Sequence, residues 1–181
     1  LLEKIVPEIE KSAPNAAFCL LAGDLTDRGD EESLLAVRDL FGRLGCPIHS
    51  VPGNHDYAGN EDRTPYDKVF PGKLNYRFEH AGWQFIGLDT TQGTHYDKTY
   101  ISDATLAWLK AETAKLDKDK PTVAFTHFPL APKVTYRPLN ADAVLDELLE
   151  LNLRAVLSGH WHGLSERKGG EAVLTTNRCC A

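Results

Sequence analysis

The chain has 181 residues, of which 42% are hydrophobic and 25% charged, enough for a single domain with a sizeable core. Its formal net charge is −6, from 26 acidic and 20 basic residues, which disfavours binding to nucleic acid. No apolar stretch approaches the roughly 20 residues that cross a bilayer. The four cysteines (Cys19, Cys46, Cys179 and Cys180) lack the spacing of metal ligands, and we expect buried free thiols.

The two ends of the sequence suggest a fragment. The chain begins with Leu1, contains no Met, and shows no charged segment or cleavage site of a secretory signal. We therefore expect one domain over residues 1–181 that is cut at both ends from a longer protein. The absence of a signal favours a cytoplasmic location, and the oligomeric state stays open.

Helical and strand patterns alternate along the chain. Helices are predicted near 1–9, where Pro7 starts or kinks the helix, over 31–44 with Asp30 as N-cap, after Ser102 or Asp103, and after an N-cap at Asn140. Strands are predicted at 17–22, 48–51, 122–126 and 155–158, with hairpins joining 76–78 to 83–88 and 164–168 to 171–176. Residues 57–74 read as a long loop. This order predicts an α/β fold with antiparallel portions in the middle and at the end.

Leucine-rich faces on two of the predicted helices are expected to point into the core. One set is Leu34, Val37, Leu40, Phe41 and Leu44, and the other is Val144, Leu145, Leu148, Leu149 and Leu151.

Four predicted strands end in side chains that can bind metals: Asp24, Asn54-His55-Asp56, His127, and His160 with His162. Open α/β sheets bind ligands at such strand ends. One histidine there is commonly a loop residue, but four in register with Gly-Asp and Gly-Asn turns indicate a metal site. Oxygen and imidazole ligands suit Mn, Fe or Zn. If two ions bind, Asp24 could bridge them, and ions ~3.5–4 Å apart activate a hydroxide and neutralise phosphate oxygens.

These motifs resemble those of the calcineurin-like metallophosphoesterase superfamily, in the same order. They are Gly23-Asp24-x-x-Asp27-Arg28-Gly29, Gly53-Asn54-His55-Asp56, His127 and Gly159-His160-x-His162. The flanking residues are most similar to class III cyclic nucleotide phosphodiesterases. The resemblance implies a four-layer α/β/β/α sandwich with two mixed sheets and two divalent or trivalent ions, of Mn, Fe or Zn, at the strand ends.

The resemblance also implies a role for each matching residue. Asp24 would bridge the ions, His162 would bind the first ion, and Asn54, His127 and His160 would bind the second. His55 would act near the leaving group, as a general acid or by stabilising its charge. Asp27 would orient His55, and Arg28 would contact the phosphate, although these two residues could instead cap the turn and pair with a nearby acid.

One family motif is missing. The superfamily opens with an Asp-x-His pair on its first strand, and no such pair precedes Asp24 here. The first ion would then keep only Asp24 and His162. We favour loss of the opening strand from this fragment; the alternative is a one-metal site with impaired catalysis.

The leading hypothesis is a metal-dependent phosphoesterase whose partner is a small phosphodiester, such as a cyclic nucleotide, or a phosphomonoester. The alternatives are a non-catalytic binding or scaffold module and a protein phosphatase. Some flanking residues stay open: Asp56 orients a ligand or caps a loop, and Trp161 is expected to pack rather than stack on a base. His95 and Tyr96 are expected in a solvated loop rather than at the rim of a pocket.

Overall fold

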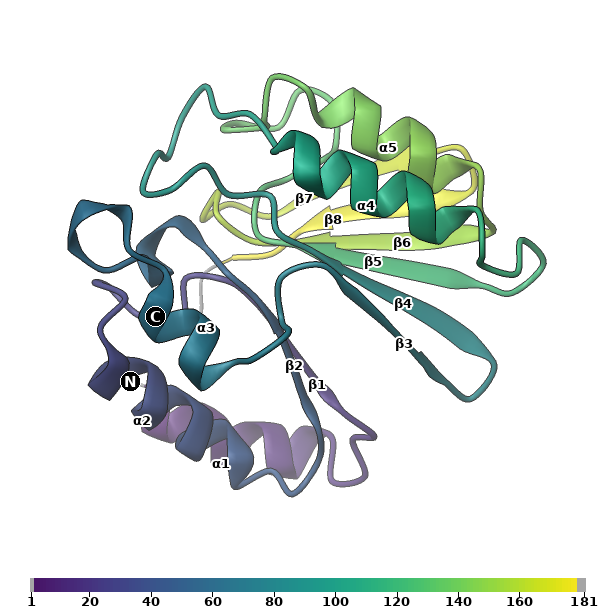
Figure 1. The fold of residues 1–181 in the computed structure, drawn as a ribbon. Coiled ribbons are helices and arrows are strands. Elements are labelled where there is room, and N and C mark those ends of the chain that lie inside the picture. The colour runs from purple at the N-terminus through teal and green to yellow at the C-terminus, as the bar shows by residue number, and fades with distance from the viewer. Residues whose placement is uncertain (1, 179–181) are drawn as a thin grey trace.

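The computed structural model describes residues 2–178 as a four-layer α/β/β/α arrangement, so Cys179 and Cys180 lie outside the described residues. In Figure 1, α4 and α5 cover the outer face of the larger sheet, and α1 and α2 cover the outer face of the smaller one. The layered α/β/β/α prediction is confirmed.

The smaller layer pair comes from the first half of the chain. It contains α1 (Leu2–Ser12), β1 (Cys19–Ala22), α2 (Glu31–Gly42) and β2 (Ile48–Val51), followed by short 3-10 turns at Asn54–Asp56 and Gly59–Glu61 and by α3 (Thr64–Val69). The strands β1 and β2 pair in parallel, with Ala22 opposite Val51. Because the pair is parallel, both strands deliver their following loops to the same edge of the sheet.

The larger layer pair follows. It contains β3 (Tyr76–His80), β4 (Trp83–Leu88), α4 (Asp103–Thr113), β5 (Thr122–Thr126), α5 (Ala141–Leu149), β6 (Leu153–Ser158), β7 (Ser165–Gly169) and β8 (Ala172–Thr176). The strand order is β3-β4-β5-β6-β8-β7. The outer pairs β3–β4 and β7–β8 are antiparallel and the central pairs are parallel. Of the two sheets, only this one is mixed, since the described part of the smaller sheet is purely parallel.

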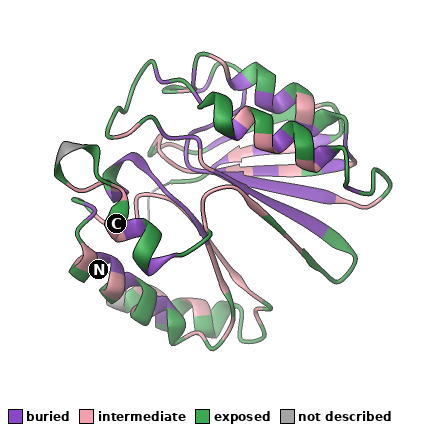
Figure 2. Cartoon of the chain, in the orientation of Figure 1, coloured by how far each residue is buried: buried purple, intermediate pink, exposed green. Residues whose placement is uncertain are grey.

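The principal apolar core lies between the six-stranded sheet and its two helices. Ile86, Ala124 and Val156 of the sheet contribute to the same cluster as Leu109 of α4 and Leu145 of α5. Figure 2 shows buried residues along the central strands and exposed ones on the outer faces of the helices. Among the described residues, none of the helices combines the length and the apolar character that spanning a bilayer requires.

Aromatic rings join the two sheets. Phe18, just before β1, meets Phe85 of β4 edge to face with 5.0 Å between ring centroids. The imidazole of His49 on β2 stacks on Phe78 of β3 at 3.6 Å, and Phe78 stacks on Phe85 at 4.8 Å. Such pairs contribute roughly 0.5–1.5 kcal/mol each beyond the area they bury. They set the position of the β1–β2 sheet, and of its loops, against the larger sheet.

Four local predictions differ from the structure. The predicted loop 57–74 contains α3, which is only six residues long and so shows too little periodicity to be seen. Asn140 stands at the N-cap position but makes no capping bond, because its side chain binds both backbone groups of Ile101. Leu149 is 40% exposed, since it lies on the outer side of α5. Cys19 is partly rather than fully buried.

Candidate metal centre

Glycines let the two turns after β1 and β2 pack tightly. Gly23 has φ of +77°, and a Cβ there would lie 2.6 Å from Nδ1 of His127. A Cβ on Gly53 would lie 2.2 Å from Oδ1 of Asp24. A side chain at Gly23 would therefore push the smaller sheet away from His127, and one at Gly53 would push apart the turns after β1 and β2.

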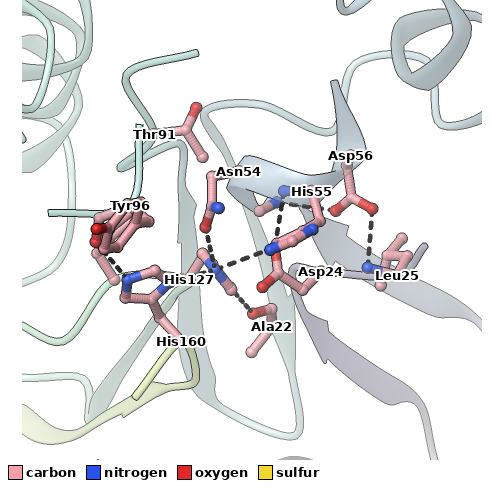
Figure 3. A network of polar contacts seen from close by, with 12 residues as sticks. Ala22, Asp24, Leu25, Asn54, His55, Asp56, Thr91, Tyr96, His127 and His160 are labelled. Atoms are coloured by element: carbon pink, nitrogen blue, oxygen red, sulfur yellow. Dashed lines mark hydrogen bonds and ion pairs between the residues drawn. The ribbon is translucent and has the colours of Figure 1, made fainter. Parts of the chain in front are cut away.

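Four polar side chains converge where the strands end (Figure 3). Nε2 of His127, just after β5, lies 3.2 Å from Oδ1 of Asp24 and 3.2 Å from Oδ1 of Asn54. The same nitrogen lies 3.1 Å from Nδ1 of His160, just after β6. The backbone N–H of Gly159 donates to the carbonyl of His127, which aligns the ends of the two strands.

Backbone carbonyls hold both imidazole rings through their other nitrogen. Nδ1–H of His127 donates to the carbonyl of Ala22 at 2.8 Å, and Nε2–H of His160 donates to the carbonyl of Tyr96 at 2.8 Å. This arrangement directs Nε2 of His127 and Nδ1 of His160 toward the cluster, as is usual for metal-binding histidines.

The donor set fits a transition-metal cation. The ligand atoms of Asp24, His127 and His160 all lie within 4.8 Å of one another. A single proton on Nε2 of His127 can serve only one of the three acceptors around it, whereas one cation can bind all four atoms. Two oxygens and two imidazole nitrogens suit Mn, Fe or Zn. Among the described residues, this is the group with the geometry of a metal site.

The charges in the cluster are strongly coupled. Burial, the largest influence, would raise the pKa of Asp24, but the hydrogen bonds and positive charges of His127 and His55 together outweigh burial and lower this pKa. Burial, followed by the charge of His127, lowers the pKa of His160 to about 4, so this ring is neutral and keeps a lone pair at neutral pH.

Two residues of the cluster have a left-handed backbone. Asp24 has φ of 49° and His160 has φ of 62°. Such conformations cost non-glycine residues of order 1–3 kcal/mol each and collect at functional sites. Here the surrounding hydrogen bonds keep both side chains aimed at His127.

Asp56 caps the two loops, which favours the structural interpretation over the orientation of a metal ligand. Its fully buried carboxylate accepts the backbone N–H groups of Leu25 at 2.8 Å and Thr26 at 3.0 Å on one oxygen, and that of Gly53 at 2.8 Å on the other. It thereby ties the turn after β1 to the turn after β2. Burial raises the pKa of Asp56 to about 6.

His55 faces a cavity, but the two residues predicted to assist it do not. Its side chain is 51% exposed, and Nδ1 lies 3.1 Å from the backbone carbonyl of Asp27 and 3.8 Å from its carboxylate. The carbonyl is therefore the closer partner. Asp27 and Arg28 are more than four-fifths exposed, pair with each other at 3.5 Å, and stand outside the cavity lining.

The cavity has a volume of about 580 Å³ and opens beside the cluster. Its lining comprises Asp24, Asn54, His55, Tyr96, Tyr136, His160, Trp161, His162 and Gly163. His162 thus borders the cavity but stands outside the group that converges on His127. Trp161 packs against the main core, as expected, and also contributes to the wall.

Two tyrosines of the wall were not predicted as site residues. Tyr96 was expected in a solvated loop, and nothing in the local sequence distinguishes Tyr136. The loops that carry them meet only in the folded chain, through a bond from the N–H of Leu139 to the carbonyl of Thr99. His95, by contrast, pairs with Glu61 at 3.5 Å, away from the lining.

Comparison with known proteins identifies a matching family and similar enzymes. A family model described as calcineurin-like phosphoesterase matches residues 1–164. The chain is 29% identical over 168 residues to a 3′,5′-cyclic-nucleotide phosphodiesterase of Nostoc sp., which covers 87% of this chain and 60% of that protein. It is 27% identical over 169 residues to a glycerophosphodiester phosphodiesterase of Enterobacter lignolyticus, again covering 87% of this chain and 60% of the relative.

A solved dimetal phosphatase from Danio rerio superposes with a TM-score of 0.75 at 18% identity, covering 97% of this chain and 76% of that structure. At this identity, the likeness shows the fold alone. The chain spans about 60% of the length of the two relatives named above.

Proposed function

The chain belongs to the calcineurin-like phosphoesterase family, and we propose that it is part of an enzyme that hydrolyses a small phosphodiester with bound metal ions. The observation that carries this proposal is the convergence of Asp24, Asn54 and His160 on Nε2 of His127 beside an open cavity. Both named sequence relatives are phosphodiesterases, which favours a diester over a monoester.

Asp24, Asn54, His127 and His160 would hold one ion of Mn, Fe or Zn. A second ion would have Asp24 and His162 as its ligands within this chain, so its affinity would be lower. When bound, the metal supplies Lewis-acid activation of water and neutralises charge on the phosphate oxygens.

His55 is the group best placed to handle a proton. It borders the cavity, and its Nδ1 is engaged by the carbonyl of Asp27, which leaves Nε2 to donate a proton to the departing oxygen. The side chain of Arg28 is exposed and could reorient toward a bound phosphate. Its contact with the substrate stays a prediction.

The test is metal-dependent hydrolysis by the chain after removal of metal and reconstitution with Mn²⁺ or Zn²⁺. We expect bis(4-nitrophenyl) phosphate to be hydrolysed faster than 4-nitrophenyl phosphate, and a His127→Ala variant to lose both bound metal and turnover. Elemental analysis of the reconstituted protein gives the metal content.

Each alternative has a distinct outcome in the same experiment. A protein that retains no metal and hydrolyses neither ester would favour a scaffold module. Faster monoester hydrolysis would overturn the diester preference, and faster release of phosphate from a phosphopeptide would favour a protein phosphatase.

A further inference from the structure

One wall of the cavity is an aromatic surface that begins at the metal cluster. Tyr136 meets the ring of His160 edge to face, with 5.2 Å between centroids. Tyr96 meets Tyr136 edge to face at 5.9 Å. The two tyrosines are 37% and 63% exposed, so both still have ring surface available to a ligand.

The loops that carry these tyrosines are pinned to one another. The side-chain amide of Asn140 accepts from the N–H of Ile101 and donates to its carbonyl, both at 2.8 Å. Within the first loop, Oε1 of Gln92 accepts from the N–H of Tyr100 at 2.8 Å. These bonds hold the two loops against each other before any ligand arrives, which lowers the entropic cost of ordering them on binding.

The backbone of Tyr136 is itself constrained. Its φ is 63°, a left-handed conformation that bulky residues rarely adopt. The neighbouring Arg137 donates from Nε to the carbonyl of Leu130 at 2.8 Å and pairs with Asp142, which holds this part of the loop. An aromatic residue kept in a costly conformation at the edge of a cavity is typical of a functional contact.

The cavity is larger than a phosphate group needs. Its volume of about 580 Å³ lies within the range of sites for whole organic ligands. A phosphate held beside Asp24 and His55 would leave the rest of the space to an ester substituent. The rest of the lining includes the aromatic residues Tyr96, Tyr136 and Trp161 together with His160, His162 and Gly163, and it contains no carboxylate, lysine or arginine.

We propose that Tyr96 and Tyr136 are specificity-determining residues that contact a planar aromatic substituent on the phosphate ester. This inference rests on the proposed function, since it describes the substituent of the same substrate. Nucleobases and aryl groups share this chemistry, whereas a glycerol-like substituent has no ring to stack.

The test uses phosphonates, which are not hydrolysed, so binding is measured independently of turnover. Calorimetric titration of the metal-reconstituted chain compares phenylphosphonate with methylphosphonate and cyclohexylphosphonate. We expect phenylphosphonate to bind about tenfold more tightly than methylphosphonate, and also more tightly than the non-planar cyclohexyl compound.

Matched variants assign this preference to the two tyrosines. Tyr96→Leu and Tyr136→Leu remove the ring and should reduce the phenyl-to-methyl ratio to about threefold or less, as one of two stacking contacts is lost. Tyr96→Phe and Tyr136→Phe keep the ring and should preserve the ratio. The Tyr96 variants keep the backbone carbonyl that binds His160.

Two sets of results would overturn the inference: equal binding or no binding of the three phosphonates, or a phenyl preference that both leucine variants retain. Failure of the proposed function gives a different pattern. The phenyl preference would then persist in a chain that hydrolyses neither nitrophenyl ester.

Discussion

His55 and Asp56 are adjacent in sequence, yet their side chains lie in opposite environments. The 3-10 turn at Asn54–Asp56 directs Asp56 inward, where it is fully buried, and leaves the side chain of His55 half exposed beside the cavity. Asn54, one residue earlier, points toward His127. A single turn thus supplies a candidate metal ligand, a candidate proton donor and a structural carboxylate.

The His55→Ala substitution should separate proton transfer from metal binding. We expect turnover of bis(4-nitrophenyl) phosphate to fall by roughly 10²–10⁴-fold, because the side chain that would protonate the leaving oxygen is gone. Metal content should stay close to that of the unmodified chain, since the side chain makes none of the contacts with His127. If metal content falls in parallel with turnover, His55 is a ligand and its assigned role is wrong.

The Asp56→Asn substitution should destabilise the fold by about 2–4 kcal/mol, because an amide has one acceptor oxygen for N–H groups that the carboxylate serves with two. Urea unfolding at pH 7.5 measures the loss, at a pH where the native carboxylate is ionised. Asp30→Asn is the matched control: Asp30 caps α2 through the N–H of Ser33, and asparagine caps equally well, so stability should change by less than about 0.5 kcal/mol. Equal losses in both variants would argue against the loop-tying role of Asp56.

At the scale of elements, the site depends on four strands that end together. β1 and β2 end side by side in the smaller sheet, and β5 and β6 do so in the larger one. The bond from His127 to the carbonyl of Ala22 crosses between the sheets. The turn at Gly53 lies within this junction, where its missing side chain leaves room for Asp24.

The Gly53→Ala substitution should disrupt the junction. Its Cβ would lie 2.1 Å from the backbone nitrogen of Asp24, so the turn after β1 must move and carry the carboxylate away from His127. We expect metal affinity to fall at least tenfold, measured by titration with Zn²⁺, together with a loss of stability. Gly59→Ala is the control, because a Cβ there meets no atom within 4 Å and should leave both quantities unchanged. Normal Zn²⁺ affinity in Gly53→Ala would contradict this account of the turn.

At the scale of the whole molecule, the aromatic contacts between the sheets hold the two halves of the site together. His49 lies in this interface, stacked on Phe78, with Nζ of Lys73 3.4 Å from its Nδ1. Burial, followed by the charge of Lys73, lowers the pKa of His49 to about 4. Since this value lies below the ordinary 6.5, the unfolded chain takes up a proton first as the pH falls.

This titration predicts that stability declines as the pH falls from about 6.5 toward 4, and that the His49→Phe variant declines less. Phenylalanine keeps a stacked ring that cannot be protonated, so the difference in unfolding temperature between variant and unmodified chain should grow from pH 7 to pH 5 in favour of the variant. A constant difference across this range would show that His49 does not contribute to the acid sensitivity.

Much of the fold and of the candidate metal site followed from local patterns. Buried strands read as apolar runs, and their ends marked Asp24, Asn54, His127 and His160, which the folded chain brings together. The closing hairpin and the antiparallel pair in the middle were predicted for the same reason. Such patterns are local because strand ends and turn glycines are properties of a few neighbouring residues.

The tertiary structure decided the features that depend on contacts between distant segments. It showed that Asp56 ties two loops, that Asn140 binds Ile101 instead of capping a helix, and that Tyr136 reaches the cavity wall. Each of these contacts joins segments that are far apart in the sequence, so no local pattern predicts that they lie close together in the fold. The sequence by itself determined which candidate ligands the strand ends carry, because each follows its own apolar run; only the packing of loops across the two sheets decided which residues surround them.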